Sequence, residues 1–182
     1  ETSFDLFVSM HYRNLGLTGL RASLISLGTG GPSRLGQPAG LSSVEQDRLI
    51  GRCFELGINL FDTSEGYGDS ERVLGRALSH FDRSSFILAT KWKYRVDDEL
   101  RKPAELTESV ETSLRRLAVD HVDLMLFHGL LPQYYHDVVA RHYPVMARRR
   151  EQGKVRFIGF SEMFTVDPQH EVAALALRTA PE

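Results

Sequence analysis

Four side chains in this sequence have the types and spacing needed for acid–base chemistry at a carbonyl or an alcohol. Asp62 ends the apolar run 58–61, and Tyr67 follows it by five residues. Lys91 ends the next apolar run and His128 the one after that, in the segments FILATK and LMLFH. A phenol is a weak acid, and a neighbouring ammonium favours its ionised form. The sequence therefore predicts a site in which Tyr67 exchanges a proton with a bound substrate.

The other three residues have separate expected roles. Lys91 supplies the ammonium beside Tyr67, and Asp62 holds that ammonium in place. His128 donates a hydrogen bond that orients a substrate oxygen. Singly, each residue also has an ordinary structural interpretation, as a turn cap or a surface loop residue, but their joint position on successive strand ends favours a shared site. None of them can supply hydride, so this chemistry requires a nicotinamide cofactor.

The elements that must position these residues alternate between strand and helix. Apolar runs repeat about every 30 residues, as βα units do, and predict strands that begin near residues 24, 58, 86, 122 and 155. Near-continuous apolar runs are typical of parallel strands buried on both faces. The carboxyl ends of parallel strands lie on one side of a sheet, so the strand-end residues are expected to meet there. Two architectures fit the pattern: an open doubly wound sheet and part of a (β/α)8 barrel.

Turn and cap signals set the bounds of the other expected elements. A small hairpin is expected over 13–22, followed by a first buried strand over 24–27. Ser42 with Glu45, or the pair one residue later, predicts a capping box at a helix start. Pro144 is expected to kink or divide a helical stretch. The remaining helices are expected over residues 70–80 and 103–117, and from about Asp167 or Pro168 to Arg178.

Composition predicts one globular domain over residues 1–182 and narrows the class of partner. Hydrophobic residues make up 42% and charged residues 25%, as in folded proteins. The net charge of −2 gives no reason to expect nucleic acid, and no apolar run approaches the ~20 residues of a membrane span. Cys53 is the single cysteine, so no internal disulfide is possible. The first nine residues lack the basic start of a signal peptide, and a reducing cytoplasm is therefore the expected compartment. No Cys/His spacing predicts a metal site.

The stretch INLFDTSEGYGDSERVLG, with the later segments ATK, LMLFH and GKVRFIGFSE, resembles the aldo/keto reductase family. In it a strand-end Asp is followed by Tyr after five residues, by Glu after four more and by Gly after a further four. The resemblance extends from about Tyr12 to Ala176. It implies a TIM-type (β/α)8 barrel, here an N-terminal portion with about five βα units and a leading β-hairpin. It also implies NADP(H) as the cofactor and aldehydes, ketones, alcohols or sugars as substrates.

The same resemblance implies roles for individual residues. The expected catalytic residues are Asp62, Tyr67, Lys91 and His128. The expected cofactor contacts are Thr29, Asp62, Ser161 and Glu162. The expected substrate contacts are Tyr67, Trp92 and His128. Family members usually carry Asn where Glu162 stands, although some sugar-dehydrogenase-like members have Glu, so recognition of the nicotinamide amide there is an open question.

Two hypotheses of different classes follow. The first is an NADP(H)-dependent oxidoreductase in which Tyr67 is the general acid or base. The second is a catalytically inactive, truncated barrel that self-associates or binds other proteins through the open edges of its first and fifth strands. In the resembled family the sixth to eighth units carry most contacts to the adenosine phosphates, and residues 1–182 contain none of these units. The loop aromatic and apolar residues near the site are expected to form either a substrate wall or ordinary loop packing: Trp92, Tyr94, Leu130, Tyr134 and Tyr135.

Overall fold

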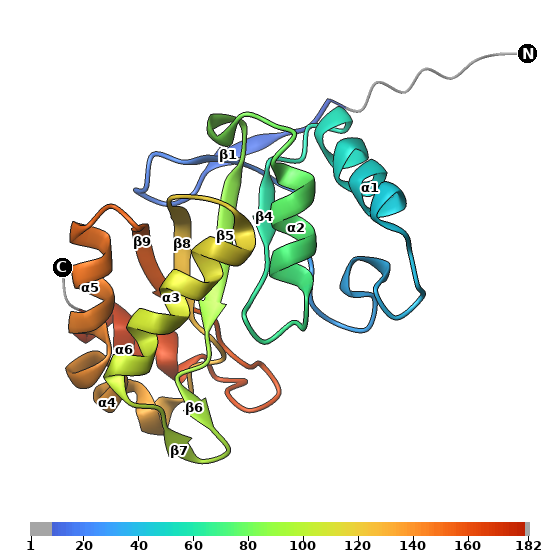
Figure 1. Ribbon diagram of the computed structural model, residues 1–182. Coiled ribbons are helices and arrows are strands. Elements are labelled where there is room, and N and C mark those ends of the chain that lie inside the picture. Colours follow the sequence, from blue (N-terminus) through green and yellow to red (C-terminus); the bar gives the residue numbers. More distant parts are fainter. Residues whose placement is uncertain (1–8, 181–182) are drawn as a thin grey trace, which may run out of the picture.

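The computed structural model describes residues 9–180, which build a five-stranded parallel sheet with helices packed against it (Figure 1). The strands lie side by side in chain order, without a reversal. A doubly wound sheet reverses its strand order at a switch point, whereas a barrel does not. The sheet is therefore part of a barrel. Its strands are β3 (Leu27–Gly28), β4 (Leu60–Asp62), β5 (Ile87–Trp92), β8 (Val122–Phe127) and β9 (Val155–Phe160).

Helices follow the strands as the βα pattern predicts. Ser42 Oγ accepts a hydrogen bond from Glu45 N, and the Glu45 carboxylate accepts one from Ser42 N, which confirms the capping box. Pro144 lies in the first turn of its helix, and the stretch around it is divided at His142. The helices are α1 (Ser43–Glu55), α2 (Ser70–Leu78), α3 (Pro103–Leu117), α4 (Tyr135–Arg141), α5 (Tyr143–Glu151) and α6 (Glu171–Thr179), with 3₁₀ turns at Arg34–Gly36, Arg83–Ser85 and Pro132–Tyr134.

Two small hairpins lie at opposite ends of the sheet (Figure 1). β1 (Tyr12–Asn14) and β2 (Arg21–Ser23) pair antiparallel near the amino ends of the strands, which confirms the expected leading hairpin. β6 (Arg95–Val96) and β7 (Glu99–Leu100) pair beyond the carboxyl end of β5, in a segment for which the sequence predicted no strand. Residues 1–8, on which the leader prediction depends, lie outside the described residues.

The predicted first strand is wrong in its extent. Leu24 and Ile25 are each 59% exposed and stand outside the sheet, and only Leu27–Gly28 pairs with β4. The reason is local, because Ser23 Oγ donates to the carbonyl oxygen of Ile25 and closes a turn there. An apolar run alone therefore did not identify the residues that enter the sheet.

The last helix begins later than predicted. Asp167 was expected near its first turn, but α6 starts at Glu171. The Asp167 carboxylate instead accepts hydrogen bonds from the backbone N–H groups of Glu171 and Val172 at 2.9 and 3.0 Å. Asp167 thus satisfies the free donors of the helix start from outside the helix.

Successive side chains along each strand point to opposite sides of the sheet. One side faces the helices, and the other side carries the polar residues at the strand ends. Phe61 and Leu88 are fully buried in the large cluster that includes the helix residues. Ile87 belongs to a second cluster, with the hairpin residues Leu20 and Ala22. Side chains in a strand alternate with a period of two, so Lys91 stands on the side of Ile87, opposite its neighbours. The register pairs Asp62 with Ala89 in the same alternation, which places both polar strand ends on one side.

Glu71 and Gly75, the last two signature positions, hold helix α2 in place. Glu71 is fully buried, accepts a hydrogen bond from Thr90 Oγ1 at 2.7 Å and lies 3.4 Å from Arg116 Nη1. A β-carbon at Gly75 would lie 2.6 Å from the backbone of Arg116 and Leu117. Only glycine allows α2 and α3 to approach so closely. These two residues therefore position the fold rather than contact a ligand.

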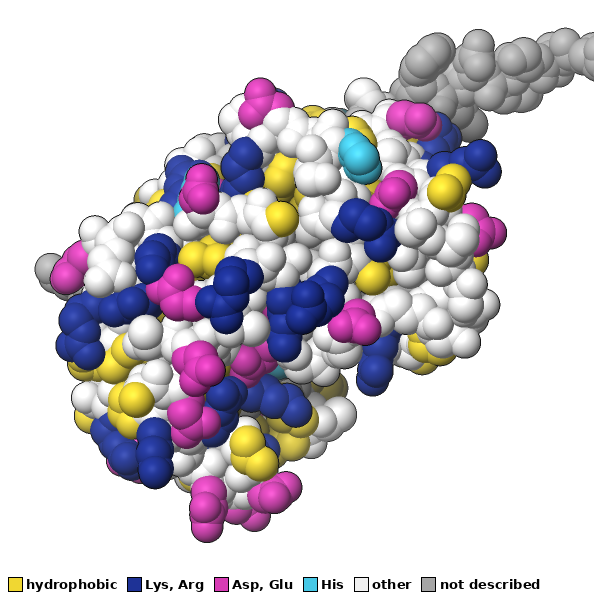
Figure 2. Space-filling view, in the orientation of Figure 1, with side chains coloured by type: hydrophobic (Ala, Val, Ile, Leu, Met, Phe, Trp, Pro, Cys, Tyr) yellow, Lys and Arg dark blue, Asp and Glu magenta, His cyan; other side chains and the backbone are white. Residues whose placement is uncertain are grey.

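The helix-covered face carries charged side chains of both signs, interspersed over α2, α3 and α5 (Figure 2). Arg149, within the basic run 148–150, pairs with Glu111, as does Lys154. This pattern is that of a solvated surface rather than of a polyanion-binding patch. No helix in the described part of the chain is both long and apolar enough to cross a membrane.

Asp123 is the polar residue on which the amino end of the sheet depends. Its carboxylate is buried and accepts hydrogen bonds from Leu88 N, Arg83 and Arg156 at 2.9, 2.7 and 2.6 Å. Burial alone raises the pKa of Asp123, but the Leu88 N–H and the two guanidinium groups lower it, and the net pKa is below its usual value. The stability that Asp123 provides is therefore present above about pH 4 and is lost as the pH falls through the folded-state pKa.

We predict that Asp123→Ala lowers the free energy of unfolding by about 3 kcal/mol, because it leaves two cations and a buried N–H without their acceptor. Urea unfolding at pH 7 measures this. Asp120→Ala, which removes an exposed carboxylate three residues earlier, should stay within about 0.5 kcal/mol of the parent. Equal effects of the two substitutions would contradict the role of Asp123.

Candidate active site

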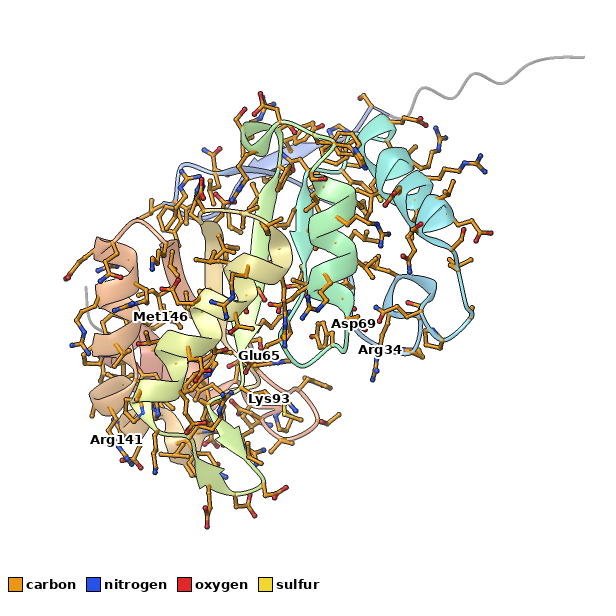
Figure 3. All side chains as sticks on the ribbon, in the orientation of Figure 1. Arg34, Glu65, Asp69, Lys93, Arg141 and Met146 are labelled. Atoms are coloured by element: carbon orange, nitrogen blue, oxygen red, sulfur yellow. The ribbon has the colours of Figure 1, made fainter. Side chains whose placement is uncertain are left out.

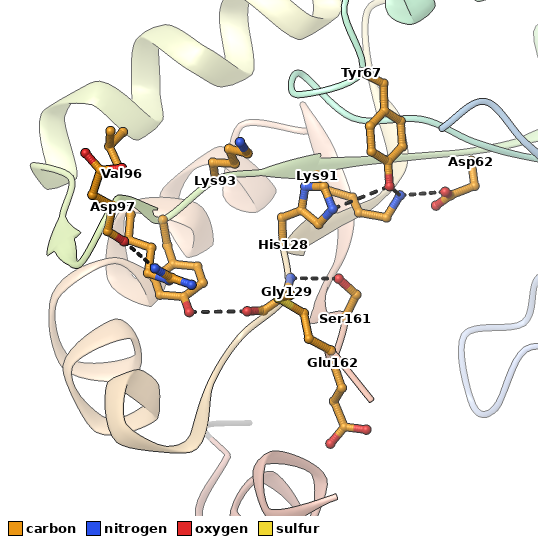
Figure 4. Close-up of a pocket in the computed structure, with 13 residues that line it drawn as sticks. Asp62, Tyr67, Lys91, Lys93, Val96, Asp97, His128, Gly129, Ser161 and Glu162 are labelled. Atoms are coloured by element: carbon orange, nitrogen blue, oxygen red, sulfur yellow. Dashed lines mark hydrogen bonds and ion pairs between the residues drawn. The ribbon is translucent and has the colours of Figure 1, made fainter. Parts of the chain in front are cut away.

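The four predicted acid–base residues lie together at the carboxyl ends of three neighbouring strands (Figure 4). Asp62 ends β4, Lys91 lies next to the end of β5, and His128 directly follows β8. Tyr67 projects from the loop between β4 and α2. All four line one cavity of about 730 Å³, together with Lys93, Tyr94, Arg95, Val96, Asp97, Gly129, Ser161, Glu162 and Met163.

The Lys91 ammonium is buried and uses its donors within the site. It donates to Asp62 Oδ2 at 2.5 Å, to the carbonyl oxygen of Thr63 at 2.9 Å and to Tyr67 Oη at 3.4 Å. An ammonium has three N–H donors, so these contacts account for all of them. The arrangement fixes one positive charge beside the phenol oxygen.

His128 contacts Tyr67 through one ring nitrogen and a buried serine through the other. Its Nε2 lies 3.4 Å from Tyr67 Oη, and its Nδ1 lies 3.0 Å from Ser64 Oγ. Ser64 Oγ also accepts a hydrogen bond from Gly66 N at 3.1 Å, and its contact with the carbonyl oxygen of Lys91 is longer, at 3.4 Å. The shorter contact favours donation from Ser64 to Nδ1. In that tautomer Nε2 carries the proton and points toward Tyr67.

The imidazole of His128 is neutral at pH 7. Burial, followed by the positive charges of Lys91 and Lys93, lowers the pKa of His128 to about 4, against a weaker opposing effect of Glu65. A neutral imidazole has a single N–H to donate. His128 thus fits a role as a hydrogen-bond donor better than as a proton carrier.

Trp92 does not reach the cavity, contrary to its expected substrate contact. It is fully buried on the helix-facing side of β5, where its ring lies 6.2 Å from that of Phe127 and 5.1 Å from that of His142. The cause is strand alternation, because Trp92 follows Lys91 directly and so points to the other face. The alternation of side chains along the strand would therefore have been enough to place Trp92 from the sequence.

Thr29 is also fully buried and does not line the cavity. Its backbone N donates to the carbonyl oxygen of Asp62 at 2.8 Å, and its own carbonyl oxygen accepts from Ser70 Oγ at 2.9 Å. Its hydroxyl oxygen has no hydrogen-bond partner among the described residues. Thr29 therefore lies beside Asp62, behind the wall of the cavity.

Ser161 and Glu162 follow β9 and both line the cavity, but their side chains have different contacts. Ser161 Oγ accepts a hydrogen bond from Gly129 N at 2.9 Å. The Glu162 oxygens contact His170 Nδ1 at 2.7 Å and Ala173 N at 3.0 Å, at the start of α6. The hydrogen bond and charge of Glu162 raise the pKa of His170. Glu162 therefore anchors a helix, and Ser161 remains directed to the site.

The expected aromatic wall is only partly present. Tyr94 lines the cavity, yet it is almost fully buried and donates to the carbonyl oxygen of Gly129 at 3.2 Å. Leu130 and Tyr135 are buried among the residues of α4 and β9 instead. Loop packing, the alternative interpretation, thus describes Leu130 and Tyr135.

Ser64, Glu65 and Lys93 were not predicted as site residues, and neither were the cavity-lining residues Arg95, Val96, Asp97, Gly129 and Met163. Ser64 and Glu65 lie between Asp62 and Tyr67, so their position in that short loop was the available signal. Lys93 lies two residues after Lys91, which strand alternation places on the same side. Within residues 9–180, no group of three or more His, Cys, Asp or Glu side chains is arranged to hold a metal ion.

Comparison with known proteins decides the family. The aldo/keto reductase family model matches residues 24–174. This chain belongs to the aldo/keto reductase family. The match includes all four acid–base residues and confirms the resemblance drawn from the signature.

Several aldo/keto reductases are similar to this chain in sequence and structure. L-galactose dehydrogenase of Arabidopsis thaliana is 35% identical over 156 residues, which are 82% of this chain and 47% of that protein. NADH-specific methylglyoxal reductase of Escherichia coli (strain K12) is 31% identical over 176 residues, 86% of this chain and 52% of that protein. An aldo-keto reductase of Bacillus halodurans, solved in a holo form, superposes with a TM-score of 0.69 at 28% identity, covering 85% of this chain and 51% of that chain.

The chain spans about half the length of the curated relatives it matches. The structures it resembles are TIM barrels, and its five-stranded sheet is a partial barrel, which confirms the predicted fold class. Aldo/keto reductases are oxidoreductases of small-molecule carbonyl compounds and generally use nicotinamide cofactors.

We predict that His128 titrates near pH 4 in NMR spectra of the ring protons and that Lys91→Met moves this midpoint upward, because one of the two cations that repel the imidazolium is removed. The same pKa makes folding less favourable as the pH falls from about 6.5 to 4, since the unfolded chain takes up the proton first.

His170 provides an internal reference in the same spectra. Its pKa is raised by Glu162, so it should titrate above the usual value for histidine, and equally in both proteins. A His128 midpoint of about 6.5 in the parent chain would contradict the described burial and charge.

Proposed function

We propose that this chain carries the acid–base machinery of an NADP(H)-dependent oxidoreductase, with Tyr67 as the proton donor and acceptor. The substrates are aldehydes and ketones in the reducing direction, and alcohols or sugars in the oxidising direction. The observation that carries this proposal is the continuous set of contacts from Asp62 through Lys91 and Tyr67 to His128 within one cavity. The family supports a small-molecule substrate, and a cytoplasmic setting is part of the same proposal.

In the reducing direction, the substrate carbonyl oxygen lies within reach of Tyr67 Oη and His128 Nε2. His128 donates its single N–H to that oxygen and orients the carbonyl group. Tyr67 then gives its proton to the oxygen as negative charge develops there. The Lys91 ammonium, 3.4 Å from Tyr67 Oη, stabilises the phenolate that forms, and Asp62 keeps the ammonium in place. In the oxidising direction Tyr67 takes the proton back.

A bound nicotinamide cofactor would supply or accept the hydride. Ser161 fits a contact with the nicotinamide amide, because it lines the cavity and no acceptor for its hydroxyl proton is found within residues 9–180. Glu162 does not fit such a contact, since both of its oxygens face the start of α6. Thr29 follows β3, and its backbone N–H donates to the carbonyl oxygen of Asp62 at the end of β4. Because the Escherichia coli relative is described as NADH-specific, binding should be measured with both NADPH and NADH.

A second function, association through the sheet edges, is supported by one observation. Among the described strands, β3 and β9 each have a neighbour on one side only. Exposed strand edges pair readily with other chains unless they are covered. Sedimentation of the 182-residue chain at micromolar concentration tests this function. A monomeric sedimentation coefficient would contradict self-association.

We predict that Tyr67→Phe lowers the kcat of carbonyl reduction at least ~100-fold, because the phenol oxygen that delivers the proton is lost. Affinity for NADPH, measured by fluorescence quenching, should change little, since the ring remains. Tyr134→Phe removes a hydroxyl outside the cavity and should retain activity.

Turnover by Tyr67→Phe at the parent rate would contradict the role of Tyr67. If neither NADPH nor NADH binds at millimolar concentration, the proposal that the 182-residue chain is itself active would be contradicted.

A further inference from the structure

One cation in the cavity has no part in the proposed proton transfer. Lys93 follows β5 directly, is exposed and lines the cavity together with Lys91. Its ammonium has no ion pair or hydrogen bond within the described part of the chain, whereas that of Lys91 is fully used. An unpaired ammonium at the mouth of a site is available to a ligand.

Hydrogen bonds hold both the backbone N–H and the carbonyl oxygen of Lys93, so the position of its Cα is fixed. Lys93 N donates to Glu65 Oε1 at 3.0 Å, and Lys93 O accepts from Arg101 Nη1 at 3.0 Å. The Glu65 carboxylate also binds Arg101 at 2.7 Å and accepts a hydrogen bond from Ser109. Glu65 is therefore engaged by the backbone of Lys93 and by two other side chains. Figure 3 labels Glu65 and Lys93 next to each other, in agreement with the hydrogen bond between them.

The side chain of Lys93 lies against the loop that carries Tyr67. A β-carbon added at Gly66 would come within 3.2 Å of Lys93 Cε, so the lysine stem packs on Gly66. In the view of Figure 4, Lys93 lies between His128 and the β6–β7 turn that carries Val96 and Asp97. The ammonium also acts on the imidazole, because it is one of the charges that lower the pKa of His128. Lys93 is thus close to the catalytic groups without touching them.

Apart from Asp97, the other charged groups of the cavity are already paired. Asp62 is bound to Lys91, and Glu162 is bound to His170 and to the start of α6. The Arg95 guanidinium donates within the β6–β7 turn, to Asp97 and Asp98. The Asp97 side chain belongs to that turn and is exposed. Of the lysine and arginine side chains that line the cavity, Lys93 is the one whose charged group has no hydrogen bond or ion pair within residues 9–180.

We propose that Lys93 binds an anionic group of the substrate, so that the cavity selects carbonyl compounds that also carry a carboxylate or a phosphate. This inference rests on the proposed function. The carbonyl carbon would lie at Tyr67 and His128, with the anionic end of the same molecule at Lys93. The ammonium is a compact point charge and forms strong charge-assisted hydrogen bonds with either oxyanion. Its fixed backbone lowers the entropy that binding costs.

Matched substrate pairs test this proposal on the full chain. One pair is 4-oxobutanoate with butanal, and the other is glyceraldehyde 3-phosphate with glyceraldehyde. In the parent, kcat/KM should be higher for the anionic member of at least one pair, and the pair that shows it identifies the anion. Lys93→Met should lower that anionic-to-neutral ratio about tenfold, as expected for the loss of a charged hydrogen bond. Lys93→Arg should keep most of the preference, and Lys102→Met, at an exposed lysine outside the cavity, should keep all of it.

A binding measurement separates the failure of this inference from the failure of the proposed function. Binding of 4-hydroxybutanoate and glycerol 3-phosphate, followed through the NMR signals of the His128 ring, needs no turnover. The parent should bind at least one of them about tenfold more tightly than Lys93→Met does, and more tightly than it binds 1-butanol or glycerol. If no aldehyde is reduced, the proposed function fails and this comparison still decides the role of Lys93. Equal binding by the parent and Lys93→Met, or an unchanged substrate ratio, would overturn the inference.

Discussion

The buried ammonium of Lys91 is the constraint on which the site depends. Removing a charge of this kind from water costs several kcal/mol, and the cost is offset only if the charge is paired and its N–H groups are bound. Asp62 provides the pairing, and the Thr63 carbonyl and Tyr67 hydroxyl complete the shell. Asp62 and Lys91 meet because β4 and β5 are parallel neighbours with the same alternation. The sheet therefore holds the positive charge beside Tyr67 Oη, where the proposed reaction would form a phenolate.

The stretch 58–75 contains both residues of the site and residues that hold the surrounding helices in place. Asp62 pairs with Lys91, Tyr67 is the proposed proton donor, and the contact with Ser64 favours the tautomer of His128 that is protonated on Nε2. Glu71 and Gly75 hold α2 against the sheet and α3, as a buried carboxylate and as a position without a side chain. The same strand, loop and helix thus explain both the fold around β4 and the geometry of the cavity.

Much of this was predictable from the sequence, because strand-end position and strand order determine which side chains meet. Residues far apart in the chain, such as Asp62 and His128, were predicted together for that reason. The failures have local causes: the turn at Ser23 kept Leu24 out of the sheet. Glu162 turned to a helix start that no periodic pattern revealed. Trp92 could have been placed correctly, since alternation with Lys91 directs it to the helices.

The central claim is that Lys91 acts on the reaction through Tyr67. A double-mutant cycle on kcat/KM for a simple aldehyde, with Tyr67→Phe and Lys91→Met alone and combined, measures this directly. If Lys91 stabilises the phenolate, the double variant should be no slower than Tyr67→Phe, because the charge has nothing left to stabilise. Multiplying effects, with the double variant slower by the product of the two single losses, would contradict the account.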